Sequence, residues 1–172
     1  MKRFFTLVCC FVFTGFSYAQ NLQKSPCLSD TVYRQFDFWI GEWDVYGPQD
    51  RKAGDSKIEL ILDSCIILEN WKSATPPYAG KSFNTYNAGT KQWQQTWVDN
   101  VGGTTEFLRG HAEKDKMIFN ADNVKDTDGK SFLRRLTFFK LSNDKVRQLG
   151  ERSDDYGKIW VTEYDLEYRR KK

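Results

Sequence analysis

Two polar side chains alternate with tryptophans in segments that read as β-strands. Successive side chains of a strand point to opposite faces of a sheet, so Glu69 shares a face with Trp71, and Gln95 lies between Trp93 and Trp97. A polar or charged group on an apolar face is costly unless it is hydrogen-bonded, paired or in contact with a ligand. These residues are therefore the first candidates for binding chemistry.

Arg135 is the third polar candidate. The same alternation places it on one face of its segment with Phe139, although the opposite face, with Leu136 and Phe138, is at least as apolar. Two interpretations stay open for the polar residues. They orient a ligand, or they form an internal ion pair or reflect an error of one residue in the register, which reverses every side chain of a strand.

Three functions are compatible with this set of residues. Binding of a small, mainly apolar ligand would use the tryptophans as walls and the polar groups to orient it. Catalysis on a small substrate would use Glu69 as a general base and Arg135 as an electrostatic stabiliser. A solid core is the third possibility, with function at the surface of an envelope protein, since large aromatic residues dominate core burial. The candidate ligand-binding residues are Glu69, Trp71, Trp93, Gln95, Trp97 and Arg135.

The chain holds no familiar catalytic or metal-binding motif. Its single histidine, His111, follows the predicted end of a strand, and no GxSxG element accompanies it. Zinc, copper, iron and haem would lack their usual nitrogen and sulfur donors. The aspartate pairs at 126 and 128 and at 154 and 155 lie in predicted turns without the spacing of a calcium loop. No metal and no cofactor is therefore expected.

Ten short β-rich segments must position these side chains. Turn residues separate them at intervals of about 8–12 residues, which is typical of a sandwich or a barrel. Consecutive hairpins make a meander, and closure of about ten strands removes the edges of an open sheet. We expect an all-β fold, a closed antiparallel meander barrel. Its strands are predicted at residues 42–46, 57–62, 65–73, 81–86, 92–99, 104–109, 117–121, 132–140, 145–152 and 159–169.

A short helix is expected before the first strand. Ser29 or Asp30 can cap it, and Tyr33 and Phe36 follow at a spacing close to one helical face. Gly41 would end it. We expect this helix to plug or brace one end of the barrel.

The first residues have the pattern of a signal peptide. Lys2 and Arg3 precede an apolar stretch, and small residues lead to a cleavage site after Ala19. The apolar stretch is shorter than the roughly 20 residues that cross a bilayer. We therefore expect residues 1–19 to be removed, residues 20–172 to form a single domain without a membrane segment, and the protein to be periplasmic or extracellular.

Charge and cysteine content fit an exported protein. After loss of the signal peptide, 24 basic residues face 23 acidic ones, which gives a net charge of +1. Nucleic-acid binding would need a basic face, and the one dense basic run is residues 169–172, so no nucleic-acid partner is expected. Cys27 and Cys65 remain as an even pair in an oxidising compartment, which predicts a disulfide between them.

Several dispersed segments carry a resemblance to a known family. They are FDFWIGEWDV (36–45), LENW (68–71), GKSFNTY (80–86), KQWQQTWVDNVGG (91–103), RLTF (135–138), KVRQLGERSDDYGKIW (145–160) and YRRK (168–171). On these segments the chain resembles, over nearly the whole mature length, domain of unknown function family 1579, small secreted bacterial calycin-like proteins. The resemblance implies a lipocalin-like barrel and no assigned activity. One departure is Gly150, where such sequences often show an aromatic residue; its absence would leave room in the barrel or mark a bulge.

Overall fold

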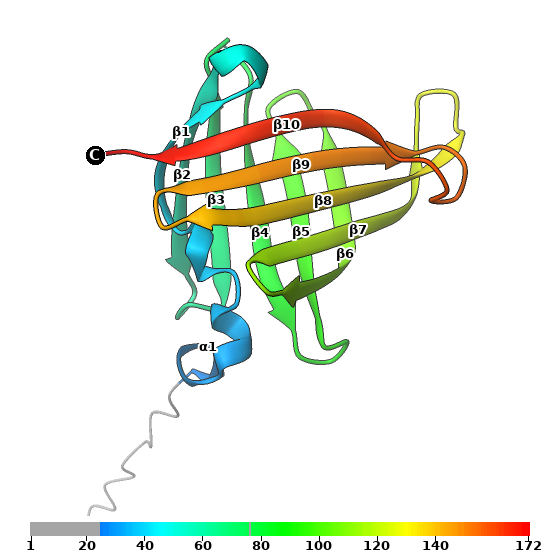
Figure 1. Ribbon diagram of the computed structural model, residues 1–172. Coiled ribbons are helices and arrows are strands. Elements are labelled where there is room, and N and C mark those ends of the chain that lie inside the picture. Colours follow the sequence, from blue (N-terminus) through cyan, green and yellow to red (C-terminus); the bar gives the residue numbers. More distant parts are fainter. Residues whose placement is uncertain (1–24, 76) are drawn as a thin grey trace, which may run out of the picture.

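A computed structural model of the chain describes residues 25–75 and 77–172 (Figure 1). Ten antiparallel strands close into a barrel in which neighbours in sequence pair and the first strand pairs with the last. The predicted closed meander is therefore confirmed, whereas the predicted signal peptide lies outside the described residues. The strands are β1 Gly41–Tyr46, β2 Lys52–Ile61, β3 Ile66–Ser73, β4 Ala79–Asn87, β5 Gln92–Asp99, β6 Thr104–Glu113, β7 Lys116–Lys125, β8 Ser131–Ser142, β9 Lys145–Ser153 and β10 Val161–Arg170.

Several strands run further than the apolar pattern indicates. β2 begins at Lys52, which pairs with Tyr46 of β1 just beyond a register shift in the β1–β2 ladder. β6 continues to Glu113, which pairs with Lys116 of β7. Polar residues at these strand ends form ladder hydrogen bonds without contributing to the core, so alternation of apolar residues could not reveal them.

The extension of β6 corrects the predicted position of the histidine. His111 lies within β6, opposite Ile118 of β7, and not beyond the end of the strand. Its side chain is exposed, and its Nε2 atom lies 3.4 Å from Glu113 Oε1. The histidine therefore faces solvent on the outside of the barrel.

The segment before β1 forms short turns in place of one helix. α1 (Pro26–Ser29) is followed by the 3-10 turns η1 (Thr31–Arg34) and η2 (Asp37–Trp39), and η3 (Pro48–Asp50) follows β1. Asp30 has extended backbone angles, and its carboxylate accepts a hydrogen bond of 3.0 Å from the Val32 N–H. A residue that caps the next turn in this way cannot continue the preceding helix, which explains the break. In the described part of the chain, no helix has the length and apolar character to span a membrane.

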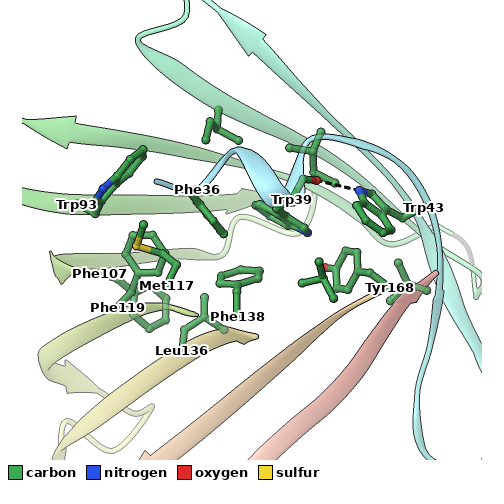
Figure 2. Close-up of a cluster of buried hydrophobic side chains, with 14 of the residues drawn as sticks. Phe36, Trp39, Trp43, Trp93, Phe107, Met117, Phe119, Leu136, Phe138 and Tyr168 are labelled. Carbon is green, nitrogen blue, oxygen red and sulfur yellow. Dashed lines mark hydrogen bonds between the residues drawn. The ribbon is translucent and has the colours of Figure 1, made fainter. Parts of the chain in front are cut away.

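The turns η1 and η2 insert an aromatic plug into one end of the barrel. Phe36 and Trp39 are fully buried, and their rings stack with centroids 5.1 Å apart. Figure 2 shows them among side chains from several strands, including Trp93 and Phe138. The Trp43 indole N–H donates a hydrogen bond of 2.8 Å to the Trp39 carbonyl. The core of the protein therefore fills this end of the barrel.

A disulfide anchors the plug, as predicted. Cys27 in α1 is bonded to Cys65, which directly precedes β3, with 4.9 Å between the two Cα atoms. The bond closes a loop with a sequence separation of 38 residues that contains the plug, β1 and β2. Cys27 is itself buried, so the bridge extends the core at this end.

Candidate ligand-binding cavity

The other half of the barrel encloses a cavity of about 500 Å³. Its lining comes from β3, β5, β6, β8, β9 and β10 and from the loops beside β4 and β6, whereas the plug contributes no lining residue. The strand ends that surround the cavity are opposite to those that contact the plug: in β5, Trp93 packs on the plug and Trp97 lines the cavity. Cavities of roughly 300–1,000 Å³ are typical of small-molecule sites.

The aromatic walls lie along the strands and leave the lumen open. A Cβ atom at Gly80 would lie 2.3 Å from Cζ2 of Trp97, and one at Gly54 would lie 2.8 Å from Cη2 of Trp71. Each indole therefore occupies the space that a side chain on the neighbouring strand would need. Because glycine stands at both positions, the rings cover backbone and do not cross the barrel.

Gly150 likewise leaves space that an aromatic ring on the neighbouring strand occupies, here the ring of Tyr164. A Cβ atom there would lie 2.4 Å from Cζ of the Tyr164 ring, and the ladder between β9 and β10 shifts register next to this pair. A bulge lies beside Gly150, and the ring of Tyr164 takes up part of the room that the glycine leaves.

A buried carboxyl group lies at the base of the cavity. Glu69 is 3% exposed, and Ser56 Oγ lies 2.8 Å from its Oε1 and Ser82 Oγ 3.0 Å from its Oε2. The Tyr168 hydroxyl lies 3.1 Å from Oε1. Burial raises the pKa of Glu69, although the three hydroxyl groups act in the opposite direction.

The hydrogen bonds continue from Glu69 to both sides. The Asn84 amide donates to Ser82 Oγ at 3.0 Å and to a strand carbonyl at 3.0 Å, and the Gln95 amide donates to Asn84 Oδ1 at 2.7 Å. On the other side, the Tyr168 hydroxyl lies 2.7 Å from Oε1 of Gln148. This polar layer lies at the boundary between the cavity and the aromatic core, where Phe107 and Tyr168 belong to both.

Most of this layer was not predicted from the sequence. Ser56 points inward but directly precedes the predicted strand at 57–62, and Ser82 points inward although its neighbour Phe83, on the outward face, is the more apolar residue. One signal was present. Both serines share the face of a glycine two residues away, Gly54 and Gly80, and small residues in succession on one face mark a place where other groups approach.

Five of the six predicted binding residues line the cavity. Glu69, Trp71, Gln95 and Trp97 do so from the inward faces of β3 and β5, and Arg135 also belongs to the lining. The alternation predicted for β3 and β5 agrees with their burial. Trp93 does not reach the cavity: it is 2% exposed, packs on the plug, and its indole N–H donates to the side chain carbonyl of Gln35 at 3.0 Å.

An ion pair between Glu69 and Arg135, one of the interpretations that the sequence leaves open, is not formed. Arg135 Nε lies 2.8 Å from Glu151 Oε2, and the two residues stand opposite each other in the β8–β9 ladder. Leu136 and Phe138 are buried in the core, so the inward face of β8 is the one opposite to that predicted. The one-residue register error that the sequence left open is thus what occurs in this strand.

Charged residues surround the mouth of the cavity. Arg134, next to Arg135 in sequence, forms a two-point ion pair with Glu163 at 2.8 and 2.9 Å. Asp99 accepts hydrogen bonds from the Gly103 N–H at 2.7 Å and from the Tyr78 hydroxyl at 3.1 Å. Burial opposes ionisation of Asp99, but these and other donors together hold the pKa of its carboxyl below the usual value.

The described part of the chain contains no cluster of metal-binding side chains. Within residues 25–75 and 77–172, no three histidine, cysteine, aspartate or glutamate side chains gather closely enough to hold a metal ion. A scan against protein-family models found no match, and no curated protein matches the chain significantly.

Proposed function

We propose that the protein binds one small molecule in the barrel cavity, with an apolar body against the tryptophans and a polar group at the base. The observation that carries this proposal is the combination of a cavity of about 500 Å³ with aromatic walls and a buried hydrogen-bonding layer. Trp71 and Trp97 would contact the body, and Glu69 and Gln95 would orient the polar group. A barrel of this kind can hold one small ligand or be filled by its own side chains, and here one half is filled and the other is open.

The two alternatives are less well supported. A solid-core protein that acts through its surface would need no cavity of this size. An enzyme with Glu69 as base and Arg135 as stabiliser would need the two groups at one point, but the Arg135 guanidinium is bonded to Glu151. Binding without catalysis fits the geometry better.

Two further proposals accompany this function. The Cys27–Cys65 disulfide supports export to the periplasm or the cell exterior, because such bonds persist in oxidising compartments. The closed barrel also agrees with the resemblance to domain of unknown function family 1579, and we propose membership on the dispersed matching segments.

A cavity-filling substitution tests the binding function. N-phenyl-1-naphthylamine is a neutral aromatic dye whose fluorescence rises in apolar surroundings, and we expect saturable binding to the purified protein. Thr105 lines the cavity opposite Trp97, so Thr105→Trp should fill part of the space and weaken binding by about tenfold or more, which equals about 1.4 kcal/mol.

Thr162→Trp is the matched control. Thr162 is an exposed residue of β10 outside the cavity lining, and the same substitution there should leave the affinity unchanged. Absence of saturable binding to the wild type, or equal loss in both variants, would contradict the proposed function.

A further inference from the structure

The charges that line the cavity are not balanced. Both arginines of the lining form ion pairs: Arg134 pairs with Glu163, and Arg135 pairs with Glu151. Two acids remain: Glu69 at the base, and Asp99 at the mouth. In the described part of the chain neither has a cationic partner within ion-pair distance, so the ionisable groups of the cavity that lack a partner of opposite charge are both acids.

The surroundings of Glu69 are arranged to hold a carboxylate. Because the Asn84 amide already donates to Ser82 Oγ, the hydroxyl proton of Ser82 is free to point at Glu69. Ser56 supplies a second hydroxyl. Three buried hydroxyl groups converge on this one group when Tyr168 is included, and an ionised carboxylate can accept a hydrogen bond from each of them.

The third hydroxyl, that of Tyr168, can form a hydrogen bond with Glu69 in either ionisation state of the carboxyl. The Tyr168 hydroxyl has one proton and lies 2.7 Å from Gln148 Oε1 and 3.1 Å from Glu69 Oε1. With a neutral Glu69 the tyrosine can donate to Gln148 and accept from the carboxyl. With an ionised Glu69 the same proton can turn to the carboxylate, so rotation of one hydroxyl prepares the site for charge.

The walls and one further polar atom suit a positive partner. Trp71, Trp97 and Tyr164 line the cavity, and a cation over such rings is attracted by their π electrons. Gln95 is 3% exposed and lines the cavity, and its side-chain carbonyl oxygen has no hydrogen-bond partner among residues 25–75 and 77–172. A carbonyl oxygen accepts a hydrogen bond from an ammonium N–H and cannot donate one.

We infer that the molecule held in the cavity is an organic ammonium ion, an amine or quaternary ammonium with an apolar or aromatic body. The inference rests on the proposed function and names its ligand class. The cation would pass Asp99 at the mouth and pair with Glu69 at the base. Burial of the pair is favourable because the hydroxyl groups already satisfy the carboxylate.

A pair of probes of equal shape tests the inference. Benzyltrimethylammonium and neopentylbenzene differ in one central atom, nitrogen with a positive charge against neutral carbon. Displacement of bound N-phenyl-1-naphthylamine gives the affinity of each for the wild-type protein. We expect the cation to bind at least about tenfold more tightly, because a desolvated cation gains from both the rings and the carboxylate.

Two charge-removing variants locate the cause. Glu69→Gln keeps the shape of the side chain and should abolish the preference for the cation. Glu106→Gln removes an exposed carboxylate on β6 outside the cavity lining and should leave the preference unchanged. A melting curve shows whether Glu69→Gln is folded, and the comparison of the two probes on the wild type stays decisive if it is not.

The outcomes separate the inference from the function on which it rests. Equal displacement by both probes, stronger displacement by neopentylbenzene, or no displacement by the cation from protein that binds the dye overturns the inference alone. A cation preference that survives in folded Glu69→Gln also overturns it. Failure of the dye and of both probes to bind overturns the inference together with the proposed function.

Discussion

At the scale of single residues, the burial of Glu69 links the stability of the fold to pH. Since burial raises the pKa of this group, the folded protein keeps a proton over a pH range in which the unfolded chain has released it. The contribution of this protonated group to the free energy of unfolding is therefore full below about pH 4.5, the ordinary pKa of glutamate. It is lost as the pH rises through the higher pKa of the folded state.

Glu69→Gln should remove this loss of stability with rising pH, because the amide does not titrate. We expect the free energy of unfolding of the wild type to fall relative to that of the variant as the pH rises above about 4.5. Urea unfolding of both proteins at several pH values measures the difference. A difference that does not change with pH would mean that Glu69 has the same pKa in the folded and unfolded chain.

Removal of the carboxyl should be costly whatever happens to Arg135. Glu69→Ala leaves the hydroxyls of Ser56 and Ser82 without their acceptor, whereas Tyr168 can still donate to Gln148, and we expect a loss of about 1–3 kcal/mol. Because Arg135 is bonded to Glu151, Arg135→Met should not restore it, and the two effects should add. Chemical unfolding of both single variants and the double variant checks this. Recovery in the double variant would show that the two side chains pair after all.

At the scale of the elements, glycines opposite aromatic rings keep the cavity open. In Gly80→Ala the new methyl group would lie 2.3 Å from the Trp97 ring and 2.7 Å from a backbone oxygen, so the indole must move into the lumen. We expect a loss of about 1–3 kcal/mol together with weaker dye binding. Gly47→Ala is the matched control, because its methyl group would meet nothing closer than 3.9 Å. Calorimetry and dye titration of the two variants distinguish them, and equal behaviour would contradict this explanation.

Strand β8 shows why its inward face could not be predicted from the sequence, whereas those of β3 and β5 could. In β5 both tryptophans lie on one face, and in the second half of β3 Trp71 stands between Asn70 and Lys72, so the apolar face is evident. In β8 both faces carry phenylalanine. Phe139 can lie outside because Arg147 and Lys116 cover its ring, at 5.5 and 6.0 Å from the ring centre. Cover of this kind depends on neighbouring strands, which alternation within one segment does not describe.

The turns before β1 show a similar limit. The aromatic spacing of that segment was compatible with one helix, and the cap at Asp30 was recognised, but the cap serves a 3-10 turn. The positions of the plug residues are therefore determined by the barrel side chains that surround them. Phe36 and Trp39 are buried because strand side chains surround them, as Figure 2 shows.

At the scale of the whole molecule, the disulfide holds the closed end of the barrel together. With a sequence separation of 38 residues, loss of the Cys27–Cys65 bond should cost about 4 kcal/mol in the chain-entropy description. Unfolding of the oxidised protein, the reduced protein and the double variant Cys27→Ser with Cys65→Ser measures this. Intact mass after thiol labelling gives the redox state, and two freely labelled thiols in protein exported to an oxidising compartment would contradict the bridge.

The seam between β1 and β10 determines how the chain must fold. Every other strand pairs with its neighbours in sequence, but this ladder places Trp43 opposite Arg170. Hairpins can form one after another along the chain, whereas the seam joins its two ends and carries the largest loop-closure entropy. Closure should therefore come late and limit the folding rate. Until it occurs, β1 and β10 are open edges that another chain can pair with, so an interrupted barrel would be prone to exchange strands with its neighbours.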